Sequence, residues 1–157
     1  MNKEHNYTIE VKWTGNLGKG TQSSAAYNRD HEISKKTSHT ILGSSDPAFR
    51  GNPDRYNPEE LLLSTLSSCH MLMYLHFCAQ NQITVMEYID NAVGVMEEHE
   101  RGSGRFTSAT LKPYIKILEG DKLEQATHLH HQSHDYCFIA NSINFPLIVE
   151  PEIEVLS

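Results

Sequence analysis

The sequence predicts an α+β fold with mainly antiparallel sheets around a buried central helix. One observation behind this prediction is an apolar run at residues 57–80 that is long enough for a helix of six turns. The other is that strand-like segments are grouped before and after this run, in the order β-β-β-α-β-β-α-β. Strands and helices do not alternate as they do in a doubly wound α/β fold. We expect one domain spanning residues 1–157.

Composition and charge narrow the class of protein. Hydrophobic residues are 38% and charged residues 21% of the chain, as in ordinary soluble proteins. The net charge of −7 argues against nucleic acid or an anionic membrane surface as a partner. The first residues have no apolar stretch typical of a signal peptide, so we expect a cytoplasmic protein. The three cysteines are then expected to be free, reactive or metal-bound.

The segment before the long helix has the pattern of a small antiparallel meander. Residues 7–14 alternate between apolar and polar side chains, which is the period of a half-buried strand. A second strand is expected at residues 23–28 and a third near residues 32–35. Residues 37–56 contain scattered glycines and prolines, which predicts a long loop that is functional or wraps a neighbour.

The start of the long helix has several independent signals. Asn57 suits the N-cap, Pro58 suits the first helical position, and Glu59 and Glu60 bring negative charge into the first turn. Apolar residues then occur nearly all round the helix, which predicts burial on most sides. Hydroxyl and histidine side chains interrupt this run too often for a transmembrane span.

The second half of the chain returns to strand patterns. We expect a strand from residue 83 to 88 that continues loosely to 96, a turn at 97–104 and a strand at 107–118. In that last segment Pro113 indicates an edge position or a bulge. A second helix is expected at residues 121–136, capped by Asp121, before a final strand at 145–155. Its inner side is predicted to comprise Leu123, Ala126, Leu129 or His130, and Ser133.

Cys69 in the middle of the long helix is the main candidate for chemistry. Cys78 follows nine residues later, which places it on the opposite side of the helix as a packing residue. Cys69 lies too far from the helix N-terminus for the dipole to stabilise a thiolate. A reactive Cys69 therefore needs a cation from elsewhere, and the candidates are Arg29, Arg50, Arg55 and His70. The alternative is a purely structural cysteine, since free cysteine is commonly buried.

The second helix offers a competing hypothesis, a metal site. His130 and His134 are spaced i, i+4 and His128 and His131 are spaced i, i+3, so each pair shares a helix face. Cys137 follows three residues after His134. The other interpretation of these histidines is a solvated polar face.

The run Asn-Pro-Glu-Glu-Leu-Leu, with Cys69 ten residues after Glu59, resembles the OsmC/Ohr family of thiol-dependent peroxidases. The later Cys-Phe-Ile-Ala-Asn-Ser segment at Cys137 resembles an OsmC-like bacterial branch of that family. The resemblance implies an intertwined homodimer in which Cys69 is the peroxidatic and Cys137 the resolving cysteine. It also implies that Arg29 faces the thiolate and that Glu59 fixes the guanidinium. Phe138 and Ala140 depart from the usual Pro and Ser after the second cysteine, and His70 replaces an aromatic or apolar neighbour.

The function that the resemblance implies is antioxidant reduction of organic hydroperoxides. Thiolate attack would give a sulfenic acid, then a Cys69–Cys137 disulfide that an external dithiol reductant reopens. We expect no cofactor, no bound metal, no nucleic-acid partner and no membrane partner. The alternative is a non-catalytic small-molecule or zinc binding protein on the same scaffold.

Overall fold

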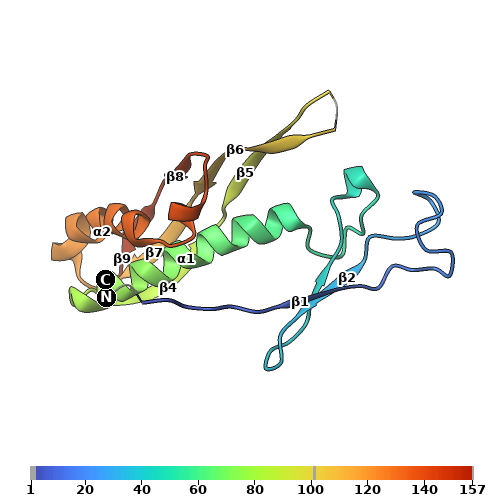
Figure 1. The fold of residues 1–157 in the computed structure, drawn as a ribbon. Coiled ribbons are helices and arrows are strands. Elements are labelled where there is room, and N and C mark those ends of the chain that lie inside the picture. Colours follow the sequence, from blue (N-terminus) through green and yellow to red (C-terminus); the bar gives the residue numbers. More distant parts are fainter. Residues whose placement is uncertain (1–2, 101, 157) are drawn as a thin grey trace. The chain divides into compact units, whose positions relative to one another are not determined.

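The computed structural model describes residues 3–100 and 102–156, and it confirms the α+β class. Two long helices and three three-stranded sheets make up the fold (Figure 1). The chain divides into two compact units, the first ending at Leu61 and the second beginning at Leu62. The single-domain prediction is not tested by this division, and each unit is described by itself below.

The first unit contains the predicted antiparallel meander, with one of its strands misplaced. Strand β2 (His31–Ser34) pairs with β1 (Glu10–Trp13) on one side and with β3 (Ile41–Gly43) on the other. The strand predicted at residues 23–28 is wrong, because this segment forms turns with one isolated bridge from Tyr27. The Arg29 side chain donates to the carbonyls of Ser24 and Tyr27 and so contacts the segment in its turn conformation.

The loop at residues 37–56 contributes β3 and a 3₁₀ helix (Pro47–Phe49), and a buried polar network holds it to β2. Ser44, which is fully buried, donates from Oγ to Asp30 Oδ1 at 3.0 Å. Arg55 Nε lies 3.3 Å from the other oxygen of Asp30. The loop is therefore ordered by a charge pair, since it contributes no buried hydrophobic side chain among its described residues.

Helix α1 (Pro58–Gln80) begins where the sequence predicts. Asn57 Oδ1 accepts from the Glu60 amide at 2.8 Å, and Glu60 Oε2 accepts from the Asn57 amide at 3.0 Å. This reciprocal pair is a capping box, which satisfies amides that have no partner inside the helix. The N-cap prediction for Asn57 is therefore confirmed.

The prediction that α1 is buried on most sides is wrong for the single chain. Its buried residues form one stripe: Leu66, His70, Tyr74, Phe77 and Cys78. By length and composition alone α1 could cross a membrane. Its C-terminal half instead packs into a hydrophobic cluster with the sheet and the second helix, as a core helix of a soluble fold does. Leu72, by contrast, is 62% exposed.

The second unit holds two mixed sheets. In one, β7 (Pro113–Ile117) lies between β4 (Val85–Asp90) and β9 (Glu152–Val155). In the other, β6 (Gly104–Leu111) lies between β5 (Val93–Glu98) and β8 (Leu147–Val149). Figure 1 shows β5 and β6 as a long hairpin with β8 beside its base. The pairs β6–β8 and β7–β9 are parallel, and the others are antiparallel.

Three segments predicted as single strands are each divided between the two sheets. The strand predicted at 83–88, with its continuation to 96, is divided into β4 and β5. The strand predicted at 107–118 breaks at Lys112, whose amide donates to the Asp90 carboxylate at 2.7 Å. Pro113 has no N–H for a continuous ladder, so β7 begins there in the other sheet. The strand predicted at 145–155 breaks in the same way at Glu150 and Pro151.

Helix α2 (Leu123–Tyr136) follows a short 3₁₀ helix (Gly120–Lys122). The predicted cap is wrong, because Asp121 lies inside the 3₁₀ helix and Lys122 takes the N-cap position without a side-chain hydrogen bond. Leu123 is also misassigned, since it is 40% exposed. The other residues predicted on the inner side are buried: Ala126, Leu129, His130 and Ser133.

Candidate functional site

Cys69 and Cys137 lie beside each other within the second unit. Cys69 is half-buried on α1, whereas Cys137 is fully buried at the C-cap of α2. Burial raises the pKa of the Cys137 thiol to about 11, and a side-chain hydrogen bond with Cys69 contributes to the rise. Cys137 is therefore a protonated thiol at neutral pH, and Cys69 is the cysteine that solvent can reach.

The turn after α2 holds Cys137 in place. The Ala140 amide donates to Cys137 Sγ at 3.4 Å, and Asn141 Nδ2 donates to the Asp135 carbonyl at 2.9 Å. Phe138, one of the departures noted in the sequence, is 78% exposed, whereas Cys137 is fully buried. The other departure, Ala140, acts through its backbone amide, which any residue except proline supplies in that position.

Cys78 occupies the core, as predicted. It belongs to the same buried cluster as Tyr74, Phe77 and Ile115. Burial raises the pKa of its thiol to about 11. A buried thiol with a raised pKa is a poor nucleophile, so Cys78 has the properties of a packing residue.

Arg29, in the first unit, is held by neutral groups. Its Nη1 donates to the carbonyls of Ser24 at 2.9 Å and Tyr27 at 2.8 Å, and its guanidinium lies 4.4 Å from the centre of the Tyr27 ring. Arg55 instead forms an ion pair with Asp30. Of these two arginines, Arg29 is thus the one whose recorded partners leave its positive charge uncompensated.

Glu59 lies in the first turn of α1, where the sequence places it. The predicted pairing of Glu59 with Arg29 is not among the ion pairs of the described residues, which are Arg55–Asp30 and Lys116–Glu87. Helix α1 continues without a break from Glu59 to Cys69. Ten residues of helix rise about 15 Å, so these two side chains belong to different places along it.

His70 and His130 form a buried pair that the sequence analysis missed. His70 Nε2 and His130 Nδ1 are hydrogen-bonded at 3.0 Å, and neither ring is more than 3% exposed. Burial lowers the pKa of His70 to about 4, so His70 is neutral at pH 7 and fails as the cation that Cys69 requires. His130 is buried, so the interpretation of the α2 histidines as a solvated face is wrong for this residue.

An open cavity of about 540 Å³ lies along α2. Its lining includes His130, His131 and His134 from the helix and the β8 residues Leu147, Ile148 and Val149. Within the described part of the chain, no three His, Cys, Asp or Glu side chains come together as a metal site would require. Among the described residues, the α2 histidines therefore do not form the cluster of ligands that their spacing along the helix could supply.

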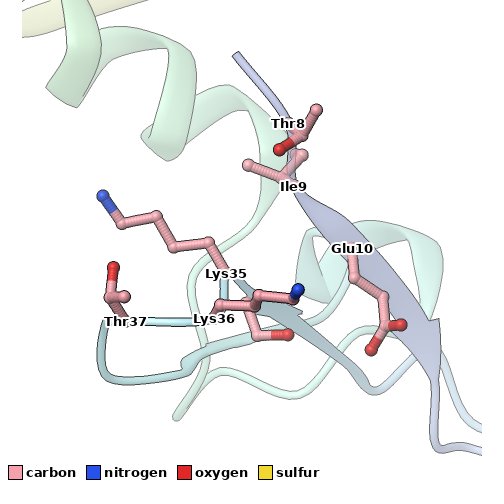
Figure 2. Close-up of a pocket in the computed structure, with 7 residues that line it drawn as sticks. Thr8, Ile9, Glu10, Lys35, Lys36 and Thr37 are labelled. Atoms are coloured by element: carbon pink, nitrogen blue, oxygen red, sulfur yellow. The ribbon is translucent and has the colours of Figure 1, made fainter.

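A second cavity, of about 620 Å³, lies in the first unit between the start of β1 and the end of β2 (Figure 2). Thr8, Ile9 and Glu10 line one side, and residues 34–37 line the other. Figure 2 shows Lys35 and Lys36 extending from the strand end. None of the four site residues predicted from the sequence contributes to it, and we treat it as a surface groove of the meander.

A half-exposed cysteine on a long helix, facing a buried cysteine at the end of a second helix, defines a dithiol protein of the α+β class. The model of the family described as OsmC-like protein matches residues 51–152. The chain belongs to the OsmC family, and the predicted fold and resemblance are confirmed.

Several solved structures have a similar fold over nearly the whole length of this chain. An OsmC-like protein of unknown function from Vibrio cholerae has 29% identity and a TM-score of 0.85, with 95% of this chain and 100% of that chain covered. An OsmC-like protein from Mycoplasma pneumoniae has 13% identity and a TM-score of 0.70, covering 99% and 100%. An organic hydroperoxide resistance protein from Elizabethkingia anophelis has 18% identity and a TM-score of 0.65, covering 98% and 100%. No curated protein matches the sequence.

Proposed function

We propose that this protein is a thiol-dependent peroxidase that reduces organic hydroperoxides in the cytoplasm. The observation that carries the proposal is the contact between half-exposed Cys69 and buried Cys137. The family supports it, since a structural relative is named an organic hydroperoxide resistance protein. The chemistry needs no cofactor, because two thiols supply both electrons.

Cys69 would act as the nucleophile. Its thiolate attacks the peroxide, an S–O bond forms, the O–O bond breaks, and an alcohol leaves. The Cys137 thiol then attacks the sulfenic acid of Cys69, and a disulfide and water form. Cys137 is fully buried and contacts Cys69, so the sulfenic acid of Cys69 is the oxidised group with which it would react. An external dithiol would restore both thiols by exchange.

Arg29 would stabilise the Cys69 thiolate, and Glu59 would hold the guanidinium in a bidentate pair. The neutral partners of Arg29 support this role, because a guanidinium already neutralised by a carboxylate is a weaker source of positive potential. Since Glu59 lies about 15 Å along the helix from Cys69, we assign the Arg29 and Glu59 of one chain to the Cys69 of another. The site is then shared by the two chains of a homodimer.

The substrate class follows from the side chains beside the thiol. Leu72 lies one helical turn after Cys69 and is 62% exposed. An exposed apolar group at this position favours a peroxide with an organic substituent over hydrogen peroxide. We therefore expect organic or lipid hydroperoxides to react faster.

A titration of thiols tests the proposal. One equivalent of cumene hydroperoxide added to the reduced protein should remove two thiols per chain and yield one equivalent of cumyl alcohol. Cys78→Ser should behave in the same way, which makes it the matched control for loss of a cysteine. Loss of a single thiol, or alcohol formation that persists in Cys69→Ser, would refute the two-cysteine mechanism.

A further inference from the structure

Two buried histidines connect α1 to α2 beside the cysteines. His70 Nε2 and His130 Nδ1 are 3.0 Å apart, with the two rings within 9° of parallel. His130 also stacks on Tyr74, the ring centres lying 3.9 Å apart. The positions of both rings are thus fixed by contacts as well as by burial.

Both imidazoles are neutral at neutral pH. Burial, with a contribution from His134, lowers the pKa of His70 to about 4. Burial, with contributions from His70 and His131, lowers the pKa of His130 to about 3. Burial also raises the pKa of Tyr74, so the ring stacked on His130 carries no charge. Among the described residues, the neighbouring charged groups that shift these two pKa values are histidines, His131 and His134, and none is a carboxylate.

A neutral imidazole pair has one donor end and one acceptor end. Two neutral rings carry two N–H groups and two lone pairs, and the bond between them uses one of each. The outer nitrogens, His70 Nδ1 and His130 Nε2, are buried and have no hydrogen-bond partner in the protein. When one outer nitrogen gains a proton and the other loses one, both tautomers exchange and no charge stays in the interior. This is the behaviour of a proton relay.

The two ends of the pair belong to different surroundings. His70 follows Cys69 directly on α1, and His134, which lies near His70, accepts a hydrogen bond at its carbonyl from the Cys137 amide. At the other end, His130 lines the open cavity along α2 together with His131 and His134. The pair thus adjoins Cys69 in the sequence of α1 through His70 and lies at the wall of the open cavity through His130.

We propose that His70 and His130 form a proton relay that serves the Cys69–Cys137 dithiol. This proposal rests on the peroxidase function above. In that reaction one thiolate, one thiol, one hydroperoxide and one proton give a disulfide, an alcohol and water. The proton of Cys137 leaves with the hydroxide released from the sulfenic acid, so one further proton must come from solvent to the alkoxide. The relay accepts it at His130 Nε2 and delivers it from His70 Nδ1.

A double substitution separates proton transfer from packing. In His70→Gln/His130→Asn the two amides reach the positions of Nε2 and Nδ1 and can keep the hydrogen bond, but they do not relay a proton. Disulfide formation is followed in a single turnover by quenched flow and thiol alkylation. We expect the rate to fall about tenfold or more, as for loss of general acid catalysis. The matched control is His128→Asn, an exposed position of α2 whose rate should equal that of the wild type.

Imidazole rescue completes the test. Free imidazole should restore the rate of His130→Ala in proportion to its concentration, and it should leave the rate of the double amide variant low. A double amide variant within about twofold of the wild type, or no rescue of His130→Ala, would overturn the relay and make the pair structural. Because hydrogen peroxide needs the same proton, the comparison can be repeated with it. A wild-type protein that forms no disulfide with either peroxide would instead refute the proposed function.

Discussion

The thiol of Cys69 lies against the thiol of Cys137, and the two differ sharply in environment. Cys69 is half-buried, while Cys137 is fully buried with its pKa raised to about 11. Cys78, the third cysteine, is in the core cluster on another face of the same helix. This asymmetry assigns an order to oxidation, because the accessible thiol reacts with a peroxide first.

Peptide mapping should find Cys69–Cys137 as the disulfide formed under mild organic peroxide. Cys69→Ser should abolish peroxide consumption, because Cys137 and Cys78 are both buried thiols with raised pKa values. Cys137→Ser should stop after one turnover, with Cys69 as a sulfenic acid that dimedone traps. A disulfide that includes Cys78, or Cys69 recovered unmodified, would contradict this assignment.

The local parts of the fold could be predicted because their signals are local. The N-cap at Asn57 and the acidic first turn lie within four residues, and the buried alternation of Ala109, Leu111, Ile115 and Ile117 has a period of two. The contact of Cys69 with Cys137 was anticipated through the family resemblance alone. The chemical roles of Arg29, Glu59, Cys69 and Cys137 remain predictions.

The features that the sequence did not predict depend on contacts between residues far apart in the chain. Pro113 predicts an edge position or a bulge, but β7 is the central strand of its sheet. The local pattern does not show the change of sheet at Lys112, because the Asp90 carboxylate that ends the ladder is 22 residues away. His70 and His130 are 60 residues apart and pair only when the two helices pack. The spacing of the α2 histidines indicated a shared face, which is equally compatible with a metal site, a solvated face or a buried partner.

The His70–His130 pair should make stability depend on pH in the acidic range. The folded pKa values, about 4 and about 3, lie below the ordinary value of 6.5, so the unfolded chain binds more protons below pH 6.5. The stabilisation is complete above pH 6.5 and is lost as the pH falls toward 4. Between pH 6.5 and 5 each histidine should cost about 2 kcal/mol of unfolding free energy. Urea unfolding at a fixed protein concentration measures this.

His70→Gln/His130→Asn is the control for that dependence, since the amides do not titrate. Carboxylates contribute equally in both proteins, so the difference between their pH profiles isolates the histidines. We expect the variant to lose distinctly less stability than the wild type from pH 6.5 to 5. Parallel profiles would show that the pair is not held neutral by the fold.

Purified, untagged protein should contain zinc well below one equivalent per chain. The described residues bring no three potential ligands together, and the Nδ1 of His130 is already bonded to His70. Elemental analysis by mass spectrometry measures the content directly. Stoichiometric zinc that disappears in His131→Ala would instead favour the metal hypothesis for α2. His130→Ala is unsuited to this test, because it also breaks the buried pair.

The protein should be a homodimer, because the first unit lacks a hydrophobic core. None of the hydrophobic side chains in its described residues, 3–61, is buried. The alternation at residues 7–14 predicts one covered face, yet both faces of β1 are exposed. The exposed fractions are 88% for Tyr7, 68% for Ile9, 60% for Val11 and 41% for Trp13. A second copy of the chain that covers this strand and the exposed side of α1 would remove that apolar surface from water.

Sedimentation equilibrium at micromolar protein should therefore give twice the mass of the chain. A monomer at that concentration would contradict the prediction.

Complementation between two inactive variants tests whether the site is shared by the two chains. Cys69→Ser and Arg29→Ala are each expected to be inactive alone. If Arg29 of one chain serves Cys69 of the other, a mixed dimer contains one intact site, formed by Arg29 of the first variant and Cys69 of the second. Unfolding and refolding an equal mixture should then restore about a quarter of wild-type activity, since half the dimers are mixed and each has one site of two. A mixture that stays inactive would place Arg29 and Cys69 of the same chain in one site, or remove Arg29 from it.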